Sequence, residues 1–229
     1  LRGRVLTRDG QPLPGARVKI ANRTEFGHTI SRLDGMFDLV VNGGGPLTLE
    51  YTRNGFLPVQ RVIDPPWHDY AWAPEVRMVP LDPNVTTADF SVTAPAQVVR
   101  GGVQTDASGT RQATLIIPEG GVLASMTLPD GTVFPNLASL NLRATEYTVG
   151  PGGPEAMPAP LPPATAYTYA VELSADEALA SNATKLTFSP PLPFYVENFL
   201  GFPVGFPVPV GTYDRTLAAW LPEDNGIVI

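Results

Sequence analysis

The sequence has no cysteine among its 229 residues, which excludes disulfide bonds, thiolate metal sites and a cysteine nucleophile. Lysine is nearly as scarce, because only Lys19 and Lys185 occur and the other basic residues are arginines scattered along the chain. The 22 acidic residues outnumber the 15 basic ones, which gives a formal net charge of -7. A chain of this charge without a basic stripe repels phosphate groups, so we expect no nucleic-acid partner.

Long apolar runs and catalytic motifs are also missing. No run approaches the roughly 18 to 20 residues of a membrane-spanning helix, so we expect no membrane insertion. The two histidines, His28 and His68, are too few for a zinc site of three or four ligands. No nucleophile elbow or phosphate-binding loop occurs, and the glycine run Gly43–Gly45 precedes no predicted helix. We therefore expect no enzyme activity, cofactor or metal, although counting residues leaves a Ser-His-Asp site open.

Carboxylates gather at three places that oxygen-preferring Ca²⁺ could use: Asp34/Asp38, Glu172/Asp176/Glu177 and Glu223/Asp224. None has the spacing of a calcium-binding loop. Because Asp-Gly is a common turn dipeptide, turn formation is the favoured interpretation, and calcium binding stays open.

Proline and glycine are abundant, at 26 and 22 residues, and leave little room for helices. Short alternating apolar runs recur every eight to twelve residues between Asp-Gly, Asn-Gly and Gly-Gly pairs, which predicts an all-β fold built of sandwiches. In the first third we expect seven strands, at residues 3–7, 16–21, 28–32, 36–41, 47–52, 59–63 and 74–79. Later strands are expected at 97–105, 111–117, 122–128, 140–148, 166–173, 185–189, 193–198, 211–214 and 218–222.

This pattern predicts two β-sandwich domains in tandem. The first covers residues 1–82, a linker covers 83–87, and the second covers 88–229. A Pro-rich insertion at 150–165 lacks too many N–H donors for a central strand, so we expect a surface crossing of polyproline type there. One short helix is expected at 175–181.

The first third carries GRVLTRDGQPLPGARVKI, TISRLDGMFDLVV and LTLEYTRNGFLPVQRVI. This order resembles the carboxypeptidase regulatory-like domain, which is a seven-stranded, transthyretin-like sandwich. In such a fold Asp34-Gly35 forms a tight turn, and Ala16, Val18, Ile20, Phe37, Leu39, Val41, Tyr51 and Phe56 are expected in the core. The resemblance implies a non-catalytic spacer and says little else about function.

A wider resemblance includes PPWHDYAWAPEVRMVPL, with Pro66-Trp67 leading into Val76 and Met78. These segments are similar to the domain that precedes the YD-repeat shell of teneurins and bacterial Rhs-type proteins. The later segments ATLIIPEGGVLASMTLPDGT and VGTYD also resemble ZU5-like sandwiches. The resemblance implies part of a large exported or cell-surface protein, and the scarcity of lysine favours a bacterial source.

Two apolar segments are the candidate interaction surfaces. Trp67, Tyr70 and Trp72 lie close together and either bind a surface glycan or protein, or join the sandwiches. Phe199, Phe202 and Phe206 lie in NFLGFPVGFPVPVGTYD, which predicts an edge strand and turn that docks on a neighbouring domain of the same polypeptide. The favoured hypothesis is a structural module that helps to seal the repeat shell. The alternative is an adhesion or glycan-binding module that uses the three aromatic residues.

Overall fold

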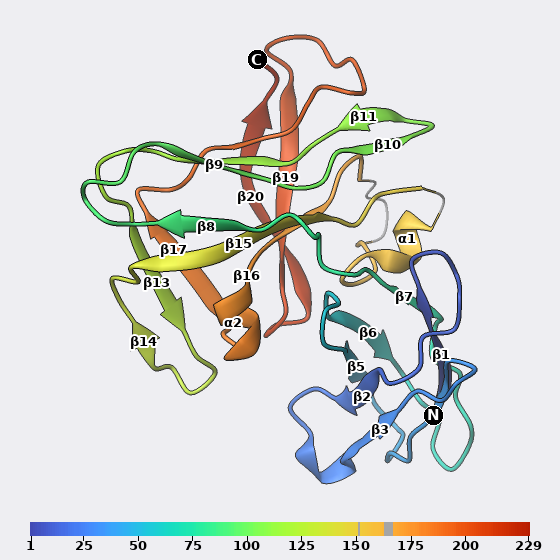
Figure 1. The fold of residues 1–229 in the computed structure, drawn as a ribbon. Coiled ribbons are helices and arrows are strands. Elements are labelled where there is room, and N and C mark those ends of the chain that lie inside the picture. The colour runs from blue at the N-terminus through green and yellow to red at the C-terminus, as the bar shows by residue number, and fades with distance from the viewer. Residues whose placement is uncertain (151, 163–166) are drawn as a thin grey trace. The chain divides into compact units, whose positions relative to one another are not determined.

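The computed structural model describes residues 1–150, 152–162 and 167–229 (Figure 1). The chain forms two compact units. Unit 1 comprises Leu1–Leu81, Gly150–Thr168 and Pro209–Gly226, and unit 2 comprises Asp82–Val149, Tyr169–Val208 and Ile227–Ile229. Residues 150–168 and 209–226, which we expected in the second domain, are thus grouped with the first.

Unit 1 contains the seven predicted strands, in two sheets. One sheet has the order β4-β1-β7 and the other β3-β2-β5-β6, with β1 and β7 parallel. The strands are β1 (Arg2–Thr7), β2 (Arg17–Ile20), β3 (His28–Ile30), β4 (Met36–Asp38), β5 (Leu47–Thr52), β6 (Val59–Ile63) and β7 (Val76–Met78). The seven-stranded sandwich predicted from alternation and turn dipeptides is confirmed.

The core of unit 1 comes from the period-two pattern. Ala16, Val18, Ile20, Phe37, Leu39 and Tyr51 are buried as expected, whereas Val41 and Phe56 are only partly buried against that core. The Asp34-Gly35 turn is confirmed: Gly35 has a φ of 77°, and Asp34 Oδ1 accepts a 2.9 Å hydrogen bond from the Met36 amide. A Cβ at Gly35 would lie 2.4 Å from the Val5 carbonyl oxygen, so this turn requires glycine.

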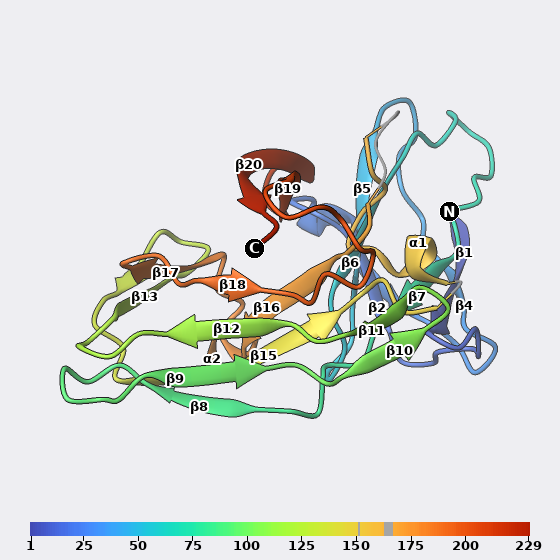
Figure 2. The same ribbon diagram turned by 90° about the horizontal axis from the view of Figure 1, so that it is seen from above.

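The Pro-rich insertion does not run over the surface as expected. It contains the short helix α1 (Gly153–Ala156), which lies beside β7 (Figures 1 and 2). Ala156, Met157 and Ala159 are each less than 10% exposed. The expectation of a polyproline-type crossing was wrong because it counted missing N–H donors but not the small apolar residues between the prolines, which pack inward.

The insertion covers the free edge of β6. The Gln60 amide donates a 2.7 Å hydrogen bond to the Pro158 carbonyl, and the buried Arg61 side chain donates to the carbonyls of Glu155 and Met157 at 2.8 and 3.1 Å. An uncovered edge strand is a template for unwanted pairing with another chain. These contacts therefore protect the four-stranded sheet.

A β-hairpin also contacts β6. It is formed by β19 (Pro207–Asp214) and β20 (Ala219–Ile227), which make a two-stranded sheet. Gln60 accepts a 2.7 Å hydrogen bond from the Tyr213 hydroxyl and donates one of 3.1 Å to the Arg215 carbonyl. The Trp220 indole N–H donates to the Pro160 carbonyl at 3.0 Å. Since an isolated two-stranded hairpin is at best marginally stable, we attribute its order to these contacts.

Unit 2 is also built of short strands. Its sheets have the orders β16-β15-β8, β18-β12-β9, β14-β13-β17 and β10-β11. The strands are β8 (Thr86–Asp89), β9 (Gln97–Arg100), β10 (Gln104–Asp106), β11 (Gly109–Arg111), β12 (Thr114–Ile117), β13 (Leu123–Thr127), β14 (Val133–Phe134), β15 (Ser139–Glu146), β16 (Val171–Ala175), β17 (Lys185–Ser189) and β18 (Phe194–Tyr195). The predicted helix is α2 (Asp176–Ala180). The all-β fold class is confirmed.

Two features of unit 2 differ from the sequence prediction. Thr86 and Thr87, placed in the expected linker, belong to β8 and pair with Leu142 and Asn141 of β15. The polar composition of this strand hid it, because only Ala88 points into the core, where it is fully buried. The first residue of the strand expected at 166–173, Ala166, lies outside the described residues; β16 begins at Val171.

An ion pair joins α2 to the middle of β15. Arg143 donates to the two carboxylate oxygens of Asp176 at 2.6 and 2.8 Å. Its guanidinium also donates a 2.6 Å hydrogen bond to the Asp82 carbonyl. This bidentate contact lowers the pKa of the Asp176 carboxyl below its ordinary value.

Acid is expected to remove the contribution of this pair to stability. Because the pKa is lower in the folded state, the contribution is complete above the ordinary aspartate value of about 4 and is lost as the pH falls through the lowered folded-state pKa. Urea unfolding from pH 7 down to about 3 should therefore show a smaller acid-induced loss for Asp176→Asn than for the unmodified chain. Glu119→Gln, at an exposed position of unit 2, is the control. Equal acid slopes for Asp176→Asn and the unmodified chain would contradict the assignment.

Candidate functional site

The segment of residues 65–72, here called the aromatic loop, lies between β6 and β7 and carries Trp67, Tyr70 and Trp72. Their exposed fractions are 64%, 84% and 67%. The rings are therefore not part of the core of the described chain. Isolated exposed apolar residues are ordinary, but three large rings within six residues form a patch, and patches of this kind mark interaction sites.

The two ends of the aromatic loop are fixed. At one end the Gly44 amide donates a 2.9 Å hydrogen bond to the Pro65 carbonyl. At the other end Arg2 of β1 forms two backbone hydrogen bonds with the loop. Its amide donates to the Ala71 carbonyl at 2.9 Å, and its carbonyl accepts from the Ala73 amide at 2.8 Å. The Arg2 guanidinium also lies 5.9 Å from the Trp72 ring centre. The loop is thus held in place although its rings are exposed.

The glycine run Gly43–Gly45 packs against the aromatic loop. A Cβ at Gly43 would lie 2.2 Å from the Pro66 carbonyl oxygen, so the backbone of the two segments touches only because this residue has no side chain. Gly44, with a φ of 93°, lies against the Trp67 ring. The sequence showed that this run is no phosphate-binding loop but did not reveal its packing role.

Alanine at position 43 is expected to displace the aromatic loop. The clash with Pro66 cannot be relieved without moving backbone, so Gly43→Ala should lower the free energy of unfolding by about 1–3 kcal/mol. Tryptophan fluorescence should change at the same time, because Trp67 rests on the same run. Gly45→Ala is the matched control, since nothing lies within 4 Å of its added Cβ, and it should change stability by less than about 0.5 kcal/mol. Equal effects of the two variants would contradict this role.

An open pocket of about 320 Å³ lies between the glycine run and the aromatic loop. It is lined by Val41, Asn42, Gly43, Pro66, Trp67, His68, Asp69 and Tyr70. His68 adopts the left-handed conformation at a φ of 57°, and its ring packs edge-on to Trp67 with ring centres 5.0 Å apart. Such a conformation is uncommon for residues other than glycine, although histidine adopts it more readily than most.

Residues 198–206, here called the Phe arm, contain the second set of predicted residues. Phe202 and Phe206 stack with ring centres 5.6 Å apart, while the Asn198 side chain exchanges two hydrogen bonds with the Phe202 backbone. Phe206 is 46% exposed, and Phe199 and Phe202 are half-buried. None of the three phenylalanines belongs to the core, so their docking role stays a prediction.

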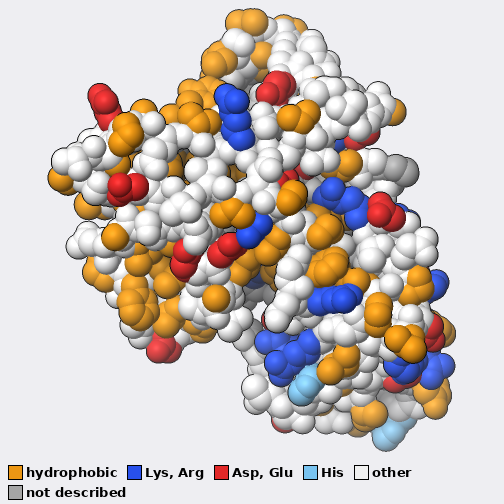
Figure 3. Space-filling model, in the orientation of Figure 1, with side chains coloured by type: hydrophobic (Ala, Val, Ile, Leu, Met, Phe, Trp, Pro, Cys, Tyr) orange, Lys and Arg blue, Asp and Glu red, His pale blue; other side chains and the backbone are white. Residues whose placement is uncertain are grey.

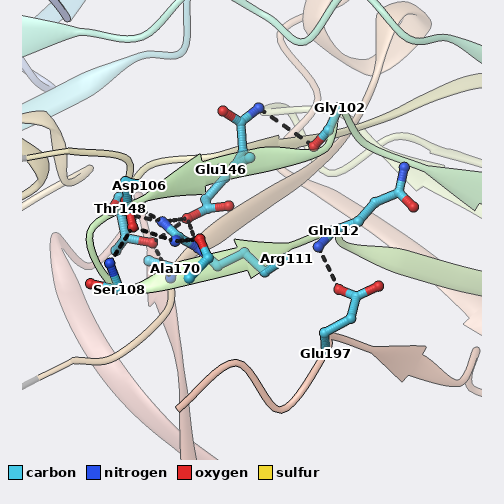
Figure 4. A network of polar contacts seen from close by, with 11 residues as sticks. Gly102, Asp106, Ser108, Arg111, Gln112, Glu146, Thr148, Ala170 and Glu197 are labelled. Carbon is cyan, nitrogen blue, oxygen red and sulfur yellow. Dashed lines mark hydrogen bonds and ion pairs between the residues drawn. The ribbon is translucent and has the colours of Figure 1, made fainter.

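Arg111 at the end of β11 is a site that the sequence did not reveal. Its side chain is 2% exposed and binds both oxygens of Asp106 at 2.9 Å and the Oε1 atom of Glu146 at 2.6–2.7 Å (Figure 4). The Phe199 ring covers the guanidinium at 4.7 Å. Hydrogen bonds to the carboxylates of Asp106 and Glu146 raise the pKa of Arg111 further above its already high value, so the guanidinium is charged at every working pH. The arrangement anchors the Phe arm.

The candidate metal and acid–base residues do not converge in the described part of the chain. The two histidine side chains lie apart at the surface (Figure 3). Among residues 1–150, 152–162 and 167–229, no three His, Asp or Glu side chains gather as metal ligands would. Four of the seven carboxylates considered for calcium have these partners: Asp38 binds Arg2 and Arg32, Asp176 binds Arg143, Glu177 binds Asn141, and Glu223 binds Thr212. No helix in this part is long and apolar enough to cross a membrane.

The sandwich of unit 1 can be compared with known protein families. Residues 1–78 match the family model described as the teneurin TTR-like domain. The first part of the chain is therefore similar to the TTR-like domain of teneurins. The match ends at the last strand of the seven, β7, so the matched residues coincide with the sandwich of unit 1.

Curated relatives extend the similarity beyond this TTR-like domain. Mouse teneurin-3 is 36% identical over 149 residues, human teneurin-1 is 32% identical over 149 residues, and fruit-fly teneurin-m is 46% identical over 69 residues. These matches cover 64%, 64% and 30% of this chain but only 6%, 5% and 2% of the relatives. A match of 149 residues is longer than the first segment of unit 1, so it includes part of unit 2. Teneurins are cell-surface proteins, in agreement with the predicted secreted or cell-surface location.

Proposed function

We propose that the chain is a non-catalytic structural module of a large cell-surface protein, in which the Phe arm packs against a YD-repeat shell and helps to seal it. The observation that carries this proposal is the Phe arm itself. Its stacked rings are ordered by Asn198 and anchored through Arg111, yet Phe206 and Val204 remain 46% and 80% exposed. An apolar segment that is rigidly held and exposed fits a docking surface for another domain.

Further support comes from the similarity to teneurins, which are long enough to supply many neighbouring domains. We infer that the parent protein is of the Rhs or teneurin-like kind, and that unit 2 is a ZU5-like sandwich placed directly before the repeats. A bacterial source agrees with the scarcity of lysine in the sequence.

Amide hydrogen exchange on two chains tests this proposal. One chain is residues 1–229, and the other continues into the repeats of the parent protein. Amides of the Phe arm should exchange at least about tenfold more slowly in the longer chain, because docking removes this segment from water. Amides around Val92, which is 80% exposed elsewhere in unit 2, are the internal control and should not change.

A double variant sharpens the test. Phe202→Ser with Phe206→Ser should abolish the protection in the longer chain while leaving the core of unit 2 unchanged, because neither ring belongs to that core. If the Phe arm exchanges equally fast in both chains, the docking proposal is wrong.

A further inference from the structure

We propose that the pocket beside the aromatic loop binds a neutral saccharide. This function is additional to the structural role and does not depend on it, because the aromatic loop and the Phe arm belong to different units. The site consists of the rings of Trp67 and Tyr70 together with the polar side chains of Asn42, His68 and Asp69.

The mixture of rings and polar groups fits a sugar better than it fits a protein surface. The C–H face of a pyranose packs on an indole or phenol ring, while its hydroxyl groups form hydrogen bonds with amide and carboxylate oxygens. A protein partner would have to cover Asp69 and His68 with apolar surface, which is costly unless each polar group is paired. The cores of protein interfaces are accordingly poor in charged residues.

The charge of the pocket indicates which sugars it accepts. Asp69 is the one carboxylate among its eight lining residues, and neither Lys nor Arg is among them. The whole chain is also acidic. An anionic sugar or a phosphate would meet a repulsive site, so the ligand should be neutral.

The size and rigidity of the pocket set the expected affinity. A volume of about 320 Å³ is at the lower end for small-molecule pockets and suits one or two sugar rings. Because the loop is fixed by Arg2 and by the glycine run, little ordering is required on binding. The pocket is open, however, so we expect dissociation constants of the order of 1 mM for single disaccharides, with tighter binding to multivalent displays.

Saturation-transfer NMR on the full 229-residue chain tests the proposal, with cellobiose, diacetylchitobiose and lactose as probes. At least one of them should receive saturation, and its affinity should fall by about tenfold or more in Trp67→Ala and in Asp69→Asn. All the altered side chains are exposed, so circular dichroism should show unchanged folding. Phe206→Ala removes an exposed ring outside the pocket and should leave sugar binding unchanged.

Three results would overturn the proposal. The first is no response to any of the three sugars at about 20 mM, well above the expected dissociation constant. The second is binding that survives Trp67→Ala. The third is stronger binding of tetramethylammonium or of sialyllactose than of the neutral sugars, which would indicate a cation or anion site instead. None of these results affects the Phe-arm experiment, so the two proposals fail separately.

Discussion

Replacing Arg111 by alanine is expected to destabilise unit 2 by about 3–5 kcal/mol, because the change leaves the buried carboxylate of Glu146 and the partly buried carboxylate of Asp106 without their cation. Losses of this size usually come from an uncompensated buried charge and are rare for surface substitutions. The Phe arm should loosen as well, since Phe199 rests on the guanidinium. Urea unfolding at pH 7 measures the loss, and hydrogen exchange at residues 198–206 measures the loosening.

Two further variants separate charge from geometry at this site. Arg111→Lys keeps the positive charge but cannot bind both oxygens of Asp106 and Glu146 together, so we expect an intermediate loss. Arg100→Ala removes an exposed arginine from strand β9 of the same unit and should change stability by less than about 0.5 kcal/mol. A loss below about 1 kcal/mol for Arg111→Ala would show that the cluster contributes little net stability.

The second large effect is expected at Arg61. Arg61→Ala removes the donor that binds the carbonyls of Glu155 and Met157; its hydrogen bond to Met157 is buried and the one to Glu155 is partly buried. We expect a loss of about 2–4 kcal/mol, since buried acceptors left without a donor cost about 1–3 kcal/mol together with the packing lost around the side chain. Residues 152–162 should then detach from unit 1 before its sandwich unfolds.

Limited proteolysis detects that release. The unmodified chain should resist cleavage within residues 152–162, whereas Arg61→Ala should be cut there under conditions that leave the sandwich intact. Arg17→Ala, at an exposed position of β2 in the same sheet, is the matched control and should behave like the unmodified chain. Equal cleavage rates in Arg61→Ala and Arg17→Ala would mean that Arg61 does not hold the insertion.

These two arginines have a common origin in the fold. Each arginine lies on a short strand, and the residues next to it in the sequence do not indicate which groups its guanidinium binds. Glu155 is 94 residues from Arg61, and Glu146 is 35 residues from Arg111. The alternation pattern predicts a side chain of β6 or β11 to be inward or outward, but it treats an inward arginine as an exception and names no partner for it.

For the candidate sites too, the sequence indicates the segment but not its contacts. The sequence selected the aromatic loop and the Phe arm as apolar segments unlike their surroundings. It could not decide whether Trp67 or Phe206 was covered, because exposure depends on which segments fold over them. The glycine run precedes no helix, so the sequence indicates that it is not a phosphate-binding loop. Its contact with Pro66 follows only from the return of the chain after β6.

The local features of this protein follow from the sequence alone: the all-β class, the seven strands of the first sandwich, the Asp34-Gly35 turn and the absence of cysteine chemistry. Each depends on residues within about ten positions of one another, where alternation and turn propensity act directly. Only the tertiary structure decided that α1 and the β19–β20 hairpin complete unit 1 and that Arg61 and Arg111 are buried. Gln60 and Tyr213 meet across 153 residues, and such a contact is selected by the packing of the whole fold.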